Sequence, residues 1–224
     1  MNKLAYQLLP DKDLSETQVY VTTQTYDRFA GKYAEKWEWN PITVREITKY
    51  NIAPVVKYAK KNGNVLLVSC QSGRDYALLS QKGFVCLGVG FSYGLLTEAI
   101  KRVPQGLFIR LNLKSLPFMP ASFDVVYADA LIHAPKKEMI ELLRDFRIFL
   151  RPKGILYLSL QLGKSKHQVM VMEDLGGKLY ITLYKKPEIM SLVKAAGFKV
   201  LWSKTSPHTD VSLPGWFSLV AKKV

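Results

Sequence analysis

"NVLLVSCQSGRDYALL", residues 64–79, is the clearest structural signal in the sequence. Four apolar residues, 65–68, are followed by small and polar residues up to Gly73, after which a helix is predicted. A strand, a short turn and a helix in this order are typical of α/β proteins that hold a ligand against a helix N-terminus. The acid and the closely spaced glycines that usually serve such a turn are absent. The local sequence alone therefore does not decide whether this turn binds a ligand.

Short apolar runs alternate with helical segments around this turn. Strands are predicted at 64–69, 84–89, 107–110, 123–128 and 154–161, and helices at 74–82, 93–103 and 136–150. Gly83 stands where a helix C-terminal glycine is expected. This alternation predicts a parallel sheet with helices on both faces.

The C-terminal part follows a different pattern. HQVMVMEDLGGKLYITLY, residues 167–184, alternates apolar and polar residues on both sides of Gly176-Gly177, which predicts a hairpin. A helix at 187–196, ending in Gly197, and strands at 198–204 and 215–222 are predicted next. The connection between these last two strands is too short for a crossover helix, so the pair is predicted to be antiparallel.

The first 60 residues are predicted to be helical. Ser15 and Gln18 have the spacing of a capping box at the start of a long helix. Asn40 and Pro41 predict the N-cap and first residue of a second helix, with a break near Ala53-Pro54. The chain is therefore expected to divide into an N-terminal helical cap, 1–60, and an α/β domain, 61–224, with a hairpin inserted near 166–184.

Composition narrows the class of protein. Of 224 residues, 48% are apolar and 22% are charged, as in ordinary globular proteins. No apolar run approaches the roughly 20 residues of a membrane span, and the N-terminus has too many acids for a secretory signal. A cytoplasmic protein without membrane association is expected. Cys70 and Cys86 are expected to be buried, reduced thiols, and no His, Cys or acid cluster has metal-ligand spacing.

The net charge of +14 is unevenly distributed. Residues 131–224 carry 16 basic and 7 acidic side chains, which is +9 of the total. A basic excess attracts polyanions such as RNA. Because the lysines are scattered, we expect at most weak RNA binding through a basic surface and no reading of a nucleic-acid sequence.

Five parallel strands with helices, closed by an antiparallel pair, form the layout of the class I S-adenosylmethionine-dependent methyltransferases, and three segments resemble that family. They are YDRFAGKYAEKW at 26–37, LPFMPASFDVVYADALIHAPKKEMIELLRDFRIFLRPKGILYLSL at 116–160 and YKKPEIMSLVKAAGFKV at 184–200. The resemblance extends from about residue 25 to the end. It implies an α/β fold with a Rossmann-like, doubly wound seven-stranded sheet, mostly parallel with an antiparallel final strand pair, and S-adenosyl-L-methionine as cofactor.

The positions that bind the cofactor in relatives are altered here. Leu67 stands where the family has an acid at the end of its first strand, and Ser69 and Gln71 stand where glycines are common. Gly90 replaces the acid that takes the ribose hydroxyls, and Asn112 replaces one near the adenine. A hydrogen bond to a charged group contributes roughly 1.5–3 kcal/mol, so cofactor binding is expected to be weak or absent unless other groups compensate. The Gln71 side chain is expected to enter space that glycine leaves free.

The resemblance still implies a set of site residues. The cofactor is expected across the carboxyl ends of the strands where strand order reverses, with the following contacts: Ser69, Ser72, Gly73, Gly90, Phe91, Asn112, Leu113 and Asp129. His133 is the candidate catalytic base, although it could instead pack or cap the next helix. Tyr26, Tyr33, Trp37 and Trp39 could line an acceptor pocket, and helix packing is the alternative for Tyr26.

The leading hypothesis is methyl transfer from S-adenosylmethionine to a small-molecule acceptor, with RNA as the less favoured acceptor. The alternative is a non-catalytic methyltransferase-like subunit or binding module that has lost tight cofactor binding. A nicotinamide-dependent enzyme is disfavoured, because the first turn lacks G-x-G-x-x-G and no Arg follows Gly90 to take a 2′-phosphate.

Overall fold

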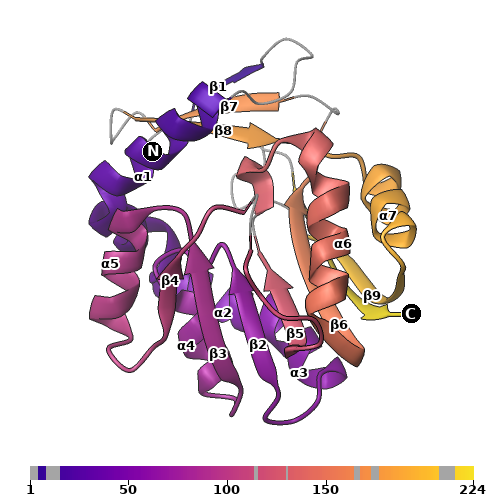
Figure 1. The fold of residues 1–224 in the computed structure, drawn as a ribbon. Coiled ribbons are helices and arrows are strands. Elements are labelled where there is room, and N and C mark those ends of the chain that lie inside the picture. Colours follow the sequence, from indigo (N-terminus) through magenta and orange to yellow (C-terminus); the bar gives the residue numbers. More distant parts are fainter. Residues whose placement is uncertain are drawn as a thin grey trace.

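A seven-stranded sheet lies at the centre of the protein, with helices on both faces (Figure 1). The computed structural model describes residues 5–8, 16–113, 116–129, 131–163, 167–172, 177–206 and 215–224, and the side chains of 5–8 and 167–172 are not described. The strands are β2 (Asn64–Val68), β3 (Val85–Gly90), β4 (Phe108–Arg110), β5 (Phe123–Ala128), β6 (Leu150–Gln161), β9 (Phe198–Ser206) and β10 (Trp216–Lys223). Their order in the sheet is β4-β3-β2-β5-β6-β10-β9.

The pairing of the strands confirms the predicted fold class. Strands β4, β3, β2, β5 and β6 are parallel, and β10 runs antiparallel to both β6 and β9. All six residues of β5 are buried, as expected for a central parallel strand that helices cover on both faces. Strand β6 begins four residues before its predicted start, and its register with β5 shifts where Lys153 takes a positive φ of 67°.

Helices on the two faces complete the core. They are α4 (Arg74–Ser80), α5 (Tyr93–Arg102), α6 (Met139–Phe149) and α7 (Lys186–Ala195), with 3-10 turns η3 (Leu131–His133) and η4 (Lys136–Glu138). Gly83 ends the segment after α4 with φ 87°, and the Phe84 amide donates to the Leu79 carbonyl, so the predicted role of this glycine is confirmed. Cys70 and Cys86 are buried and form no disulfide.

The N-terminal segment is helical, with two π-helical turns. It comprises α1 (Glu16–Tyr33), η1 (Ala34–Glu38), α2 (Pro41–Ile47), η2 (Thr48–Ile52) and α3 (Ala53–Tyr58). The Asn40 side chain accepts from the Thr43 amide at 2.9 Å, which confirms the predicted N-cap. The predicted break near Ala53-Pro54 is wrong. Ile52 and Ala53 keep helical φ and ψ, and the π-helical turn before Pro54 accommodates the proline without ending the helix. Ser15 lies outside the described residues.

A second sheet lies near the carboxyl ends of the parallel strands (Figure 1). It contains β1 (Ala5–Leu8), β7 (His167–Met172) and β8 (Gly177–Thr182), in the order β1-β7-β8. The antiparallel pairing of β7 with β8 confirms the predicted hairpin, whereas β1 had no sequence signal. Helix α1 packs against β8 and α5, and together they cover this end of the central sheet (Figure 1). Among the helices that the structure describes, none is long and apolar enough for a membrane span.

Candidate functional site

The candidate site lies where the strand order reverses, between β2 and β5. The turn after β2, the turn after β3 and Asp129 after β5 meet at this end of the sheet. Ligands of open α/β sheets bind at this point. Leu67, which stands at the family's acidic position, is buried in the core beside α3 and α4 and offers no polar group to a ligand.

The turn after β2 keeps a glycine-like backbone without most of the glycines. Ser69, Gln71 and Gly73 have φ values of 63°, 52° and 85°. This left-handed region costs roughly 1–2 kcal/mol for a residue with a Cβ atom. The shape of the turn is therefore retained, although two of its three left-handed positions carry side chains.

Gly73 is required by helix packing. A Cβ atom at this position would lie 3.1 Å from the Ala99 Cβ atom and 3.2 Å from its Cα atom, and its φ is positive. Helix α5 thus approaches the turn so closely that a side chain at Gly73 would displace it. This glycine holds α5 beside the site, and contact with a ligand is not needed to explain it.

Ser72 is bonded to the N-terminal segment. The Glu38 Oε2 atom accepts from both the amide, at 2.9 Å, and the hydroxyl of Ser72, and Trp39 Nε1 donates to the same hydroxyl at 2.9 Å. Burial raises the pKa of Glu38, while Arg74 and the bonds from Ser72 oppose this shift. Strand β2 carries no carboxylate at its end, and Glu38, 34 positions before Ser72, places one beside the turn instead.

Arg74 links the remaining acids of the site. Its Nε atom lies 2.6 Å from Asp75 Oδ1, and its Nη2 atom lies 3.4 Å from Asp129 Oδ2. The Tyr127 hydroxyl donates to Asp75 at 3.0 Å, and Asn51 donates to Asp129 at 3.3 Å. Burial, followed by the charge of Asp75, raises the pKa of Asp129 to about 7 against the opposing effect of Arg74. Three carboxylates, including Glu38, therefore act on this single guanidinium.

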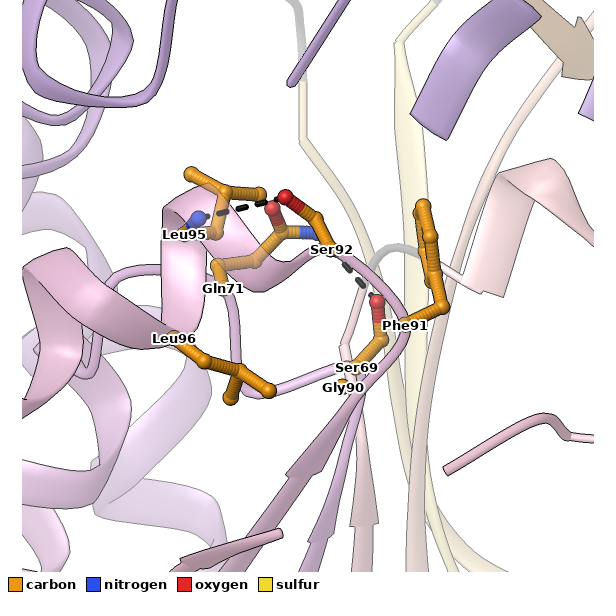
Figure 2. A pocket seen from close by; sticks show the side chains of 7 residues that line it. All are labelled: Ser69, Gln71, Gly90, Phe91, Ser92, Leu95 and Leu96. Atoms are coloured by element: carbon orange, nitrogen blue, oxygen red, sulfur yellow. Dashed lines mark hydrogen bonds between the residues drawn. The ribbon is translucent and has the colours of Figure 1, made fainter. Parts of the chain in front are cut away.

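A small hollow lies beside this network, between the turns after β2 and β3 (Figure 2). Its volume, including the open mouth, is about 190 Å³, and its lining is Ser69, Gln71, Gly90, Phe91, Ser92, Leu95 and Leu96. This figure includes space open to solvent, so the enclosed part is smaller still, whereas typical small-molecule sites measure roughly 300–1,000 Å³. The hollow is thus too small for a whole nucleoside cofactor unless a lining side chain moves. Gln71 enters this space, as its position in the sequence predicts (Figure 2).

The turn after β3 also receives an acid from the N-terminal segment. Asp27 Oδ1 accepts from the Ser92 hydroxyl at 2.5 Å and from the Gly94 amide at 3.0 Å. Ser92 is the N-cap of α5 and accepts from the Leu95 amide at 3.1 Å. A Cβ atom at Gly90 would lie 3.2 Å from Leu96 Cδ2, so a larger residue there would push on this leucine.

His133 is held on both ring nitrogens. Its Nδ1 atom is 2.8 Å from the Tyr180 carbonyl and donates to it, so Nε2 is the acceptor for the Tyr26 hydroxyl, also at 2.8 Å. Burial lowers the pKa of His133 to about 4. The histidine ties η3 to α1 and β8. To act as a base on a substrate, it would first have to lose the Tyr26 bond.

Aromatic side chains under α1 pack against this histidine. The Tyr26 ring lies edge-on to Tyr33 at 5.0 Å and to Phe91 at 6.1 Å between ring centroids. Phe91 also lies edge-on to His133 at 6.1 Å. Tyr26 therefore has the packing role that its helical spacing allows, while Trp39 contacts the site directly through Ser72.

The structure brings together most of the residues that the resemblance implies. Those that meet at the carboxyl ends are Ser69, Ser72, Gly73, Gly90, Phe91 and Asp129. Asn112 and Leu113 follow the edge strand β4, where Asn112 is exposed and Leu113 packs against the core. Sequence reasoning missed Glu38, Asp27 and Asn51, which reach the site from distant helices, and Arg74, whose place directly after Gly73 was a usable signal. In the part of the chain described, no group of three or more His, Cys, Asp or Glu residues could hold a metal ion.

Known proteins share both the fold and part of the sequence. Residues 65–154 match a family model described as a methyltransferase domain. A protein of Encephalitozoon cuniculi, named "Putative methyltransferase", is 28% identical over 157 residues, which cover 62% of this chain and 67% of that protein. The match to the family model therefore supports the predicted resemblance over the segment from β2 to the start of β6.

Two solved structures illustrate the breadth of the fold. The Burkholderia thailandensis 1,6-didemethyltoxoflavin-N1-methyltransferase, solved with bound 1,6-didemethyltoxoflavin and S-adenosylhomocysteine, has a TM-score of 0.74 at 17% identity, covering 99% of this chain and 96% of that one. The [4+2]-cyclase SpnF has a TM-score of 0.69 at 15% identity, covering 90% and 95%. At these identities the similarity is one of fold.

Proposed function

We propose that this chain, whose residues 65–154 match a methyltransferase-domain family model, belongs to the class I S-adenosylmethionine-dependent methyltransferases. It binds S-adenosylmethionine at the carboxyl ends of β2, β3 and β5 and supports methyl transfer to a small-molecule acceptor. The cofactor supplies a sulfonium methyl group as the group to be transferred. The protein then needs mainly to position the acceptor nucleophile in line with it. A fixed catalytic residue is not required for that task.

The observation that carries this proposal is the excess of buried acid at the turn after β2. Glu38, Asp75 and Asp129 share one guanidinium, and burial raises the pKa of both Glu38 and Asp129. A cationic ligand would stabilise the ionised carboxylates. The ammonium and sulfonium groups of S-adenosylmethionine are such cations. We assign Glu38 and Asp129 as the carboxylates that take over from the missing acid at Leu67.

Acceptor size is inferred from the cover over the site. Helix α1 and β8 lie at this end of the sheet, and His133, Tyr26 and Tyr180 bond them to one another. A covered site suits a small acceptor better than a polymer. Because both nitrogens of His133 are occupied, we propose that it holds this cover in place, and we do not assign it the role of base.

The first experiment is a calorimetric titration of the wild-type chain with S-adenosylhomocysteine. We expect binding, and a loss of roughly tenfold in affinity for Glu38→Gln, since a hydrogen bond to a charged group contributes about 1.5–3 kcal/mol. Glu35→Gln is the matched control, because Glu35 is exposed and lies one helical turn from Glu38. Equal affinity of the two variants would remove Glu38 from the site.

The second candidate function is a non-catalytic methyltransferase-like subunit. The small hollow and the lack of an acid at Gly90 favour it. The same fold in the cyclase SpnF also leaves room for a chemistry other than methyl transfer. No heat of binding at millimolar S-adenosylhomocysteine, in wild type and in Gly90→Asp alike, would select this candidate.

RNA is the competing acceptor, given the net charge of +14. We expect weak binding that falls steeply with salt and does not distinguish transfer RNA from an unrelated duplex. Binding isotherms for both nucleic acids at about 0.15 M salt test this expectation, that being near physiological ionic strength. A preference for transfer RNA above about a hundredfold, close to 3 kcal/mol, would make RNA the acceptor.

A further inference from the structure

We infer that the Gln71 side-chain carbonyl is the acceptor for the ribose hydroxyls, in place of the acid that Gly90 lacks. The inference rests on the proposed cofactor site and assigns it a residue that determines affinity. Gln71 and Gly90 line the same hollow from different turns, the first after β2 and the second after β3 (Figure 2). The hydrogen-bond acceptor that is missing at Gly90 is thus supplied by Gln71 from the other turn.

The two ends of the Gln71 amide differ in their bonding. Its Nε2 atom donates to the Ser69 hydroxyl at 3.2 Å. Its Oε1 atom is buried and has no hydrogen-bond partner among the residues that the structure describes. A buried carbonyl without a donor is destabilising, and such atoms in native proteins indicate a missing partner. The free end of this side chain therefore calls for a hydrogen-bond donor.

The Ser69 hydroxyl accepts from the Nε2 end of the same amide, and no other side chain lining the hollow donates to Oε1 in the described structure. Ser92 already donates its hydroxyl proton to Asp27, and Phe91, Leu95 and Leu96 are apolar. Figure 2 shows Gln71 extending across the hollow toward Ser92, with Phe91 on the other side. The fitting ligand group is a neutral hydroxyl, because the nearby carboxylate of Asp27 is already bonded to Ser92 and Gly94. A vicinal diol offers two such donors to one carbonyl.

The conformation of the turn directs this side chain into the hollow. Gln71 has φ 52°, where glycine would be free of strain. The rotatable bonds of glutamine let the amide swing from the centre of the hollow to its edge. The space vacated is then available to the ribose, and the carbonyl remains within the same wall.

The simplest competing explanation is that Gln71 only blocks the hollow. The two explanations predict opposite signs for Gln71→Gly. If the side chain blocks the site, its removal tightens adenosine binding. If the carbonyl accepts from the ribose, its removal weakens adenosine binding and leaves an analogue without the hydroxyls unaffected.

The test compares adenosine with 2′,3′-dideoxyadenosine on the full chain by calorimetry. For Gln71→Gly we expect roughly a tenfold loss of adenosine affinity and less than a twofold change for the dideoxy analogue. For Gln71→Glu, whose acceptor is charged, we expect tighter adenosine binding than in wild type. Gln81→Gly, in the segment after α4 and away from the hollow, is the matched control and should bind both ligands like wild type.

The outcomes separate this inference from the proposed function. Tighter binding of both ligands to Gln71→Gly, or equal loss for both, would overturn the role of Gln71 while leaving the cofactor site in place. No binding of adenosine or S-adenosylhomocysteine to the wild-type chain would overturn the cofactor site and this inference with it.

Discussion

The turns after β2 and after β3 are each bonded to a carboxylate from the N-terminal segment, but the surroundings of the two carboxylates differ. Each starts a helix beside the candidate site, and each receives a carboxylate from the N-terminal segment. Glu38 accepts from Ser72 at the first turn, and Asp27 accepts from Ser92 and Gly94 at the second. In both places an acid from a distant helix lies near a position where the strand itself carries none.

The difference between the turns lies in what surrounds each acid. Glu38 belongs to a buried network with Arg74, Asp75 and Asp129, and its pKa is raised. Asp27 is half-buried and is bonded to a hydroxyl and a backbone amide, as a helix cap is. The first turn therefore suits the charged end of a ligand, and the second suits its neutral part.

Removal of the Arg74 guanidinium should change stability more than any other substitution at the two turns. Arg74→Leu leaves buried carboxylates without their cation, and we expect the free energy of unfolding to fall by roughly 3–5 kcal/mol. Arg144→Leu is the control, because its ion pair with Glu141 is exposed and should contribute less than about 1 kcal/mol. Urea denaturation of both variants measures the difference. Equal, small losses would show that the network of the first turn is not held by Arg74.

The pH dependence of stability should come from the first turn. The pKa of Asp129 is raised from 3.8 to about 7, so the folded protein binds a proton that the unfolded chain has released. The associated stability is present below about pH 4 and is lost as pH rises through about 7, with a slope approaching about 1.4 kcal/mol per pH unit. Asp129→Asn should flatten this slope in denaturation curves between these limits. An unchanged slope would contradict the burial of an ionisable Asp129.

Asp27→Ala should lower the free energy of unfolding without changing ligand affinity. Asp27 bonds to the N-cap Ser92 and to the Gly94 amide, and the loss of contacts of this kind costs about 0.5–2 kcal/mol. We expect S-adenosylhomocysteine affinity to stay within twofold of wild type, in contrast to Glu38→Gln. Urea denaturation and calorimetry on the same preparation measure both quantities, with Glu35→Ala as an exposed control on the same segment. A large loss of affinity would make the two turns alike in function.

The smallest effect concerns the backbone of the first turn. Gln71→Gly should raise the free energy of unfolding by about 0.5–1 kcal/mol, since glycine adopts φ 52° without strain. Gln81→Gly should lower it by a similar amount, because Gln81 has an ordinary helical φ of −62° and glycine adds only unfolded-state freedom there. Thermal unfolding of the two variants shows whether each substitution raises or lowers the free energy of unfolding. A loss in both would mean that the bond from Gln71 Nε2 to Ser69 contributes more to stability than relief of the backbone strain at Gln71.

Much of the central sheet was predictable because its signals are local. Strand β5 matches its predicted bounds, β2 ends one residue early, and β3 is shifted by one residue at both ends, since the apolar runs mark these strands clearly. Strand β1 is four residues long and pairs with β7 across more than 150 positions, so nothing nearby in the sequence marks it. The break predicted at Pro54 failed because a π-helical turn absorbs the missing amide.

By itself, the sequence determined the order of strands and helices from β2 to β10, the family resemblance and the loss of acids at Leu67 and Gly90. Those features depend on residue type and on neighbours within a few positions. Only the tertiary structure decided what replaces the lost acids. Glu38 meets Ser72 over 34 positions, Asp27 meets Ser92 over 65, and Tyr26 meets His133 over 107. Such pairs form because the packing of α1 against α5 and β8 brings them within hydrogen-bond distance, and no local pattern in the chain encodes that approach.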